Sequence, residues 1–126
     1  MKQLVFIAIG GSIGAILRYI LSTFINKLNL SSFILGTLMV NVIGCFLAGI
    51  TFAYFEKNIM NVKHLELFFI TGILGAFTTF SAYGIECAKY IEAGNINHMI
   101  LNILVTNILG LAMVFLGIYI GKSIWS

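Results

Sequence analysis

Four long apolar runs, separated by short polar stretches, make up almost the whole chain. The runs extend over Leu4–Ile25, Phe33–Phe55, Leu67–Ile91 and Met99–Ile124. Each is long enough to cross a bilayer as a helix, which takes roughly 20 apolar residues. The polar stretches are Asn26–Ser32, Glu56–Glu66 and Glu92–His98. Because these connections leave no room for a soluble domain, we predict an all-α membrane protein. Residues 1–126 then form a single four-helix transmembrane domain.

Helices are the expected form of these runs because every backbone N–H and C=O within lipid needs an internal partner. A membrane barrel would instead show alternating segments of about ten residues. The first run also has features of a cleaved signal peptide, since Lys2 precedes an apolar stretch. However, the run continues through Gly10 and Gly11 to Ile25 without an A-x-A-like cleavage site. We therefore predict a retained membrane helix.

The composition agrees with a membrane protein and argues against several other classes. Hydrophobic residues make up 60% of the chain and charged residues 9%, whereas soluble domains carry about 25% charged residues. The net charge of +3 comes from scattered cations, and no basic patch with interleaved aromatics suggests a nucleic-acid partner. Cys45 and Cys87 lie within predicted helices and suggest neither a disulfide framework nor a metal site. The sequence also has no nucleophile–base pair and no phosphate loop, so we do not expect an enzyme.

The cations give a weak prediction of topology. With four crossings both termini lie on one side, and the lysines expected there are Lys2, Lys57, Lys63 and Lys122. Lys27 and Lys89 fall on or near the other side, and Arg18 lies in the first helix toward it. The positive-inside rule thus favours cytoplasmic termini by a small margin. This small margin fits an ordinary protein whose charges indicate its orientation poorly. It equally fits dual topology, in which copies insert in both orientations and pair antiparallel.

Polar residues in the first two helices are candidates for function because they are costly in lipid. Arg18 is the only arginine; it either extends to the interface or forms an electropositive vestibule or structural tether. Gly10 and Gly14 form a G-x-x-x-G motif, which allows close helix packing. Thr37 and Asn41 are four residues apart and share a helix face. The Asn41 amide either joins two helices or donates two N–H bonds to an anion without adding a fixed charge.

The third helix carries the most unusual segment, Gly72–Gly84. It places the hydroxyls of Thr78, Thr79 and Ser81 among glycines and aromatics in the middle of the span. Such hydroxyls bend helices, and interrupted membrane helices coordinate ions in several transporter folds. We therefore predict a break near the middle of this helix. Phe80 and Tyr83 share a face; they either pack ordinarily or direct their positive ring edges toward a small anion.

The fourth helix and the acidic residues add weaker indications. Asn102, Thr106 and Gly110 form one stripe, with Asn107 beside it, and Gly117 and Gly121 form a second G-x-x-x-G motif. A polar stripe suits an ion path and also ordinary helix association. The acidic residues are only Glu56, Glu66, Glu86 and Glu92. Glu86 lies in the outer part of the third helix, where it can pair with Lys89 at i, i+3.

The segments GGSIGAILRY, GTLMVNVIGCF and GILGAFTTFSAY together resemble the signatures of the Fluc (CrcB-type) fluoride channels. They occur in that family's order and spacing, and the resemblance covers essentially the whole chain. It implies an antiparallel dual-topology dimer with two pores, each lined by both subunits. It also implies a structural sodium ion at the break in the third helix, in a multi-pass protein of the cytoplasmic (inner) cell membrane.

The resemblance also implies roles for individual residues. The residues expected along the fluoride path are Asn41, Phe80, Tyr83, Thr37, Ser81 and Thr106. The backbone carbonyls of Gly75 and Thr78 would hold the sodium ion, and Arg18 would be structural or vestibular. Two positions depart from the family's pattern: Tyr83 replaces the second pore phenylalanine, and Asn102 stands where many members have tyrosine.

The function expected from this resemblance is passive, fluoride-selective export that confers fluoride resistance. The two departures leave open whether the chain forms a homodimer or a heterodimer with a paralogue. One alternative is a non-conducting or partner-dependent subunit of a heterodimeric channel. A second alternative is a small multidrug antiporter, but that class needs a membrane-embedded glutamate in the first helix, and this first helix has no acidic residue.

Overall fold

The structure, a computed structural model, describes residues 1–28, 33–58 and 63–125, and all the regular structure in these ranges is helical. The helices are α1 (Lys2–Leu28), α2 (Leu35–Lys57), α3 (Lys63–Glu66), η1 (Leu67–Leu74), α4 (Gly75–Phe77), α5 (Phe80–Glu92) and α6 (Ile96–Trp125). In this part of the chain, four helical stretches are long and apolar enough to cross a membrane. They are Lys2–Leu28, Leu35–Lys57, Lys63–Glu92 and Ile96–Trp125. The predicted all-helical class with four long apolar spans is thus confirmed.

The predicted ends of the helices were wrong in several places. Asn26–Leu28, Lys63–Glu66 and Ile96–His98 belong to helices, although their polarity suggested connections. A helix that continues past the apolar layer keeps its backbone hydrogen bonds while its polar side chains reach water, so polarity alone does not end it. The rest of the first two predicted connections includes residues 29–32 and 59–62, which lie outside the described residues.

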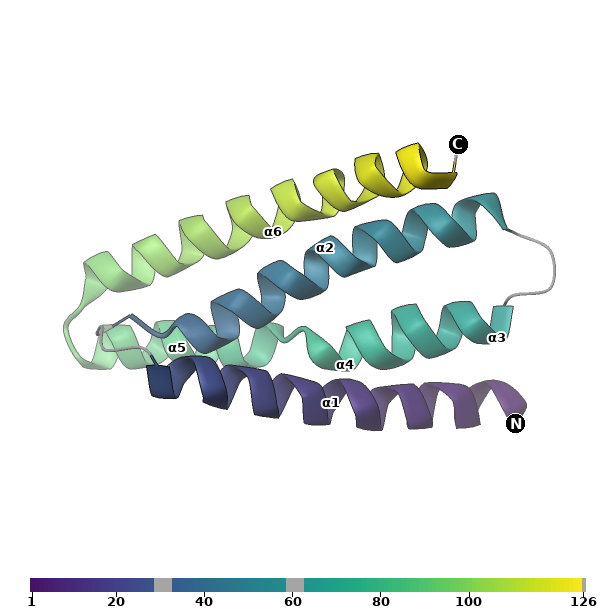
Figure 1. The fold of residues 1–126 in the computed structure, drawn as a ribbon. Coiled ribbons are helices and arrows are strands. Elements are labelled where there is room, and N and C mark those ends of the chain that lie inside the picture. The colour runs from purple at the N-terminus through teal and green to yellow at the C-terminus, as the bar shows by residue number, and fades with distance from the viewer. Residues whose placement is uncertain (29–32, 59–62, 126) are drawn as a thin grey trace.

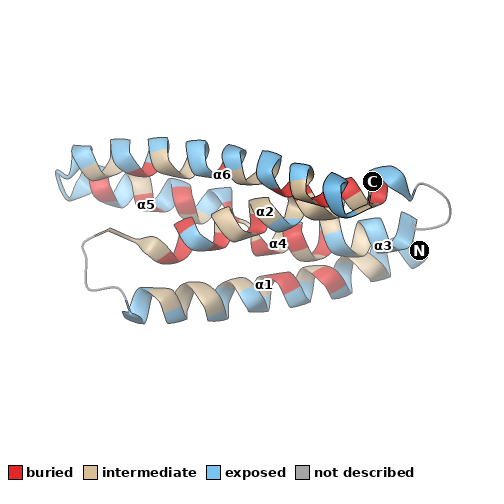
Figure 2. Ribbon diagram, turned by 45° about the horizontal axis from the view of Figure 1, so that its top comes forward, coloured by how far each residue is buried: buried red, intermediate tan, exposed pale blue. Residues whose placement is uncertain are grey.

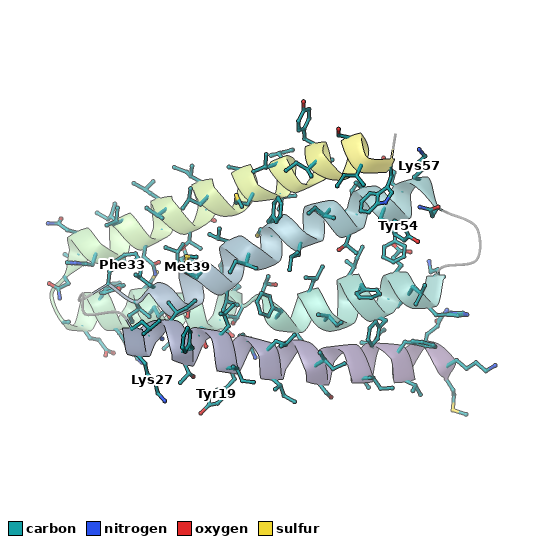
Figure 3. All side chains as sticks on the ribbon, in the orientation of Figure 1. Tyr19, Lys27, Phe33, Met39, Tyr54 and Lys57 are labelled. Carbon is teal, nitrogen blue, oxygen red and sulfur yellow. The ribbon has the colours of Figure 1, made fainter. Side chains whose placement is uncertain are left out.

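The four spans lie side by side as a bundle with both termini at the same end (Figure 1). The third span consists of α3, η1, α4 and α5 in succession and lies beside α1. Lys57 and Lys27, both labelled in Figure 3, lie at opposite ends of the bundle. This agrees with the sides that the sequence assigned to these two lysines.

Glycines allow two pairs of helices to come into backbone contact. A methyl group on Gly14 of α1 would overlap the carbonyl oxygen of Ile73 in η1. Likewise, a methyl group on Gly49 of α2 would overlap the carbonyl oxygen of Val114 in α6. The close approach predicted for the first G-x-x-x-G motif is therefore confirmed, and it fixes α1 against the first half of the third span. The contact between α2 and α6 positions the polar residues of those two helices.

The outer surface of the bundle is apolar. Figure 2 shows exposed residues along the outward faces of α1 and α6. Large apolar side chains such as Ile108 and Phe115 are more than 60% exposed, at 62% and 68%. A water-soluble domain rarely exposes so continuous an apolar surface. With the four long apolar helices, this surface fits a multi-pass membrane protein.

The turn between α5 and α6 ends α5 with a defined cap. Gly94 has φ of 71°, a left-handed conformation that favours glycine. Its N–H donates to Ile91 O at 2.9 Å, and Asn95 N–H donates to Tyr90 O at 2.8 Å. These two bonds form the Schellman arrangement, which satisfies the last carbonyls of a helix. The tight turn places the start of α6 directly beside α5.

The start of α2 is capped by side chains from other helices. Ile34 N–H donates to the Tyr90 hydroxyl at 2.8 Å, and Gly36 N–H donates to Asn26 Oδ1 at 2.8 Å. The first amides of a helix have no partner within the helix itself. Tyr90 of α5 and Asn26 of α1 supply those partners, so they hold the start of α2 at a fixed position. Thr37 and Asn41 follow within the next two turns.

Candidate functional site

The third span is interrupted at Thr78 and Thr79, in the segment where the sequence suggested a break. Thr78 has φ −76° and ψ 155°, and Thr79 has φ −149° and ψ 121°, so both are extended between α4 and α5. The Thr79 hydroxyl then accepts a hydrogen bond from Ala82 N–H at 3.2 Å. This is an N-cap, for which threonine is suited. The sequence therefore both interrupts the span and restarts it.

The Asn41 amide pairs the Thr79 N–H, which the break leaves without a helical partner, and also donates to the Thr79 carbonyl at the N-cap of α5. Asn41 Nδ2 donates to Thr79 O at 3.0 Å, and Thr79 N–H donates to Asn41 Oδ1 at 2.7 Å. Of the two roles that the sequence left open for this amide, the structure shows the one that joins two helices, and one of its two hydrogens already serves Thr79. Unpaired backbone groups are costly away from water, and this explains why the amide is used in this way. One Asn41 N–H remains for a ligand.

Two backbone carbonyls at the break lose the amides that they would pair with in a continuous helix. The partner of Gly75 O would be Thr79 N–H, which donates to Asn41 instead. The partner of Thr78 O would be Ala82 N–H, which donates to the Thr79 hydroxyl instead. Freed carbonyl oxygens are suitable ligands for a hard cation. Within the described residues, no cluster of three His, Cys, Asp or Glu side chains could hold a metal ion.

A cavity of about 440 Å³ adjoins the break between α2, the third span and α6. It brings together five of the residues predicted for the site: Asn41, Gly75, Thr78, Phe80 and Thr106. Cys45 and Asn107 also line it. The Phe80 ring is 81% exposed in the single chain, so one side of this cavity is open. Polar atoms and an exposed aromatic ring thus meet at the interruption of the span.

A second cavity of about 320 Å³ brings together three more of the residues predicted for the site. Arg18 of α1, Thr37 of α2 and Ser81 of α5 line it, together with Tyr19 and Thr79. Among the residues that the structure describes, Thr79 alone lines both cavities. Arg18 is partly buried, and it is the one charged residue among those lining this cavity. All the predicted residues except Tyr83 are therefore divided between an uncharged cavity and a basic one, with the break between them.

Tyr83 lines neither of these cavities, although the sequence placed it on the path with Phe80. Its side chain is buried, and its ring centroid lies 5.3 Å from that of Phe80 at an interplanar angle of 52°. Its hydroxyl accepts a hydrogen bond from Asn107 Nδ2 at 3.2 Å. The two rings therefore meet, but only Phe80 is directly exposed to the first cavity.

Glu86 is a buried polar residue whose position the sequence analysis missed. The Thr37 hydroxyl donates to Glu86 Oε1, and Glu86 Oε2 has no hydrogen-bond partner among the described residues. The expected ion pair with Lys89 does not occur among the described residues. Glu86 lies three residues after Tyr83, on the face that packs against α2 and α6. The three-residue spacing from Tyr83 was the signal in the sequence that Glu86 is buried, but the nearby Lys89 suggested an exposed position instead.

Asn102 and Thr106 continue the buried polar cluster on α6. Asn102 is 1% exposed, and its Oδ1 accepts a hydrogen bond from the Thr106 hydroxyl at 3.1 Å. Asn102 Nδ2 donates to Cys87 Sγ at 3.6 Å. Two members of the polar stripe predicted on this helix, Asn102 and Thr106, thus use hydrogen-bonding groups within the protein. Of its members, Thr106 and Gly110 line the first cavity.

Comparison with known proteins identifies the family. The model of the family described as CrcB-like protein, Camphor Resistance (CrcB), matches residues 5–118. A protein of Azobacteroides pseudotrichonymphae named "Fluoride-specific ion channel FluC" is 40% identical over 117 residues, which cover 93% of this chain and 94% of that protein. Proteins of the same name from Parabacteroides distasonis and Desulforapulum autotrophicum are 40% and 38% identical. These alignments cover 98% and 97% of this chain, and 96% and 98% of the two relatives. The chain therefore belongs to the CrcB-like protein family.

Proposed function

We propose that this chain forms a fluoride-selective channel, which lets fluoride leave the cell passively across the cytoplasmic membrane and so confers fluoride resistance. The observation that carries the proposal is the uncharged cavity at the break, whose mostly apolar wall holds a few polar groups. Asn41, Phe80 and Thr106 line it, and no lining residue among those described is charged. A conducting site must bind an ion and also release it, and neutral donors meet both needs for an anion. The names of the relatives support fluoride as the ion.

The proposed path runs through groups that can replace the water around a fluoride ion. Arg18 in the second cavity would attract the anion, and the Ser81 hydroxyl would offer a donor there. Thr37 lines the same cavity, and its hydroxyl donates to Glu86. Beyond the break, the free N–H of Asn41 would donate in the first cavity, which Thr106 also lines while its hydroxyl donates to Asn102. The edge of an aromatic ring carries positive potential, so the Phe80 ring would add a contact that suits a small anion.

We propose that a second copy, inserted in the opposite orientation, completes the path. The first cavity has an open side, where Phe80 is 81% exposed and Gly75 is also exposed. If this open side faced lipid, the freed carbonyls of Gly75 and Thr78 would have no hydrogen-bond partners there. The small difference in lysines between the two ends favours neither orientation strongly, which suits insertion of copies both ways up.

We further propose a structural sodium ion at the break. The carbonyls of Gly75 and Thr78, whose helical partners are diverted, would hold it. A bound cation would supply positive charge that stabilises these two oxygens. Replacing sodium with N-methylglucamine should then lower the melting temperature of the purified dimer, and returning sodium should restore it. An unchanged melting temperature would argue against the ion.

The experiment that tests the function is ion efflux from liposomes that contain this protein alone. Fluoride efflux is followed with a fluoride electrode, and chloride efflux from matched liposomes is the control. Rapid efflux of fluoride but not chloride is the expected result. Because Tyr83 and Asn102 depart from the family's pattern, a partner-dependent subunit is the alternative. In that case, well-folded protein alone would pass no fluoride, and adding a paralogous subunit would restore the flux.

A further inference from the structure

Tyr83 and Asn107 form a hydrogen-bonded pair beside the first cavity. Asn107 Nδ2 donates to the Tyr83 hydroxyl at 3.2 Å and to Ile103 O, one turn earlier on α6, at 2.7 Å. Asn107 lines the cavity, and the Tyr83 ring contacts Phe80, which also lines it. The pair therefore connects α5 and α6 next to the proposed fluoride path.

The carbonyl of Ile103 determines the direction of this hydrogen bond. A carbonyl oxygen only accepts hydrogen bonds, so the atom of Asn107 that lies 2.7 Å from it must be the amide nitrogen. The same nitrogen lies 3.2 Å from the Tyr83 oxygen. The two N–H groups of Asn107 thus serve Ile103 and Tyr83. Consequently the Tyr83 oxygen acts as the acceptor in this pair.

An acceptor role leaves the Tyr83 hydroxyl proton unused. A phenol can donate one hydrogen bond in addition to those that it accepts. Among the described residues, none accepts a bond from the Tyr83 hydroxyl, and the side chain is only 8% exposed. A buried donor without an acceptor is unfavourable in the absence of a ligand. The hydroxyl is thus a prepared donor beside the path.

We propose that Tyr83 donates this proton in a hydrogen bond to fluoride, and that Asn107 is a positioning residue that keeps the proton free for the ion. The inference rests on the proposed channel function and adds one donor to it. A phenylalanine at position 83 would offer only a ring edge. Small anions accept stronger hydrogen bonds from O–H groups than large ones, since their charge is more concentrated. The additional donor would therefore favour fluoride over chloride.

The flux test compares two single variants with the double variant in liposomes. A hydrogen bond to a charged group contributes about 1.5–3 kcal/mol, so Tyr83→Phe should slow fluoride efflux about tenfold or more. Asn107→Leu should slow it when Tyr83 is present and have no further effect in the Tyr83→Phe background. Tyr119→Phe, which removes an exposed hydroxyl from the outer face of α6, is the matched control and should leave the flux unchanged.

A spectroscopic measurement on the unmodified sequence separates donation from a structural role. Fluoride is titrated into protein labelled with ¹³C at the tyrosine Cζ, and the Tyr83 signal is assigned by its loss in Tyr83→Phe. We expect fluoride, but not chloride, to shift this signal, and Asn107→Leu to reduce the shift. No response to fluoride in a protein that conducts fluoride would overturn the inference while leaving the channel function intact. Equal efflux by Tyr83→Phe and the unmodified protein would overturn it too.

Discussion

Replacing Asn41 with alanine should weaken the third span at its break. The Asn41 amide makes hydrogen bonds of 3.0 Å and 2.7 Å to the carbonyl and the N–H of Thr79. Each buried backbone group left unpaired costs about 1–3 kcal/mol. The adjoining cavity of about 440 Å³ can admit water to replace part of this loss. The Thr79 carbonyl keeps its bond within α5 as the N-cap carbonyl, so only the Thr79 N–H is left unpaired. We therefore expect a local destabilisation of about 1–2 kcal/mol.

Hydrogen exchange at the Thr79 amide measures this loss directly. Since about 1.4 kcal/mol corresponds to a factor of ten, the amide should exchange about 5- to 30-fold faster in Asn41→Ala. The matched control is Asn58→Ala at the exposed end of α2, where the side chain donates only to Tyr54 O at 2.9 Å. It should leave Thr79 exchange unchanged. If Asn41→Ala and Asn58→Ala gave the same Thr79 exchange rate as the unmodified protein, Asn41 would not be the partner of the break.

Three further predictions concern helix packing, the start of α2 and the proposed path. Gly14→Val should lower the melting temperature and cost about 1–3 kcal/mol, because its side chain would overlap the Ile73 carbonyl. The control is Gly11→Val, which should leave the melting temperature unchanged because a Cβ there meets nothing within 4 Å. Tyr90→Phe should cost about 1–3 kcal/mol in thermal unfolding, because the first amide of α2 loses its acceptor; equal stability would contradict the cap. Phe80→Ile should slow fluoride efflux from liposomes up to about tenfold by removing the ring edge, and unchanged efflux would remove Phe80 from the path.

The sequence predicted the spans well because lipid imposes a simple rule on them. A run such as Phe33–Phe55 is apolar over most of its length, and a helix satisfies its backbone in a membrane. The ends were harder to predict, since Lys63–Glu66 is helical although polar residues also favour loops. The glycine contacts were predictable from spacing. Helices approach most closely at small residues, and Gly14 shows this contact with Ile73.

The site was predictable in its residue types but only partly in its contacts. The hydroxyls and glycines around Thr79 indicated an interruption, yet nothing in the local sequence showed that Asn41, 38 positions earlier, pairs with it. Glu86 illustrates the same limit, because its partner Thr37 is 49 positions away. Contacts between distant positions depend on the relative rotation and depth of whole helices. A single sequence contains no direct record of either.

The order of the spans along the chain bears on how the protein enters the membrane during synthesis. Chains are made from the N-terminus, and early segments are available before later ones. Asn41 in α2 therefore precedes Thr79, so the partner of the broken backbone is already synthesised when the third span emerges. The interrupted span can then insert next to a helix that pairs its exposed groups at once. A chain in which α2 followed the third span would leave those groups unpaired in lipid until synthesis was complete.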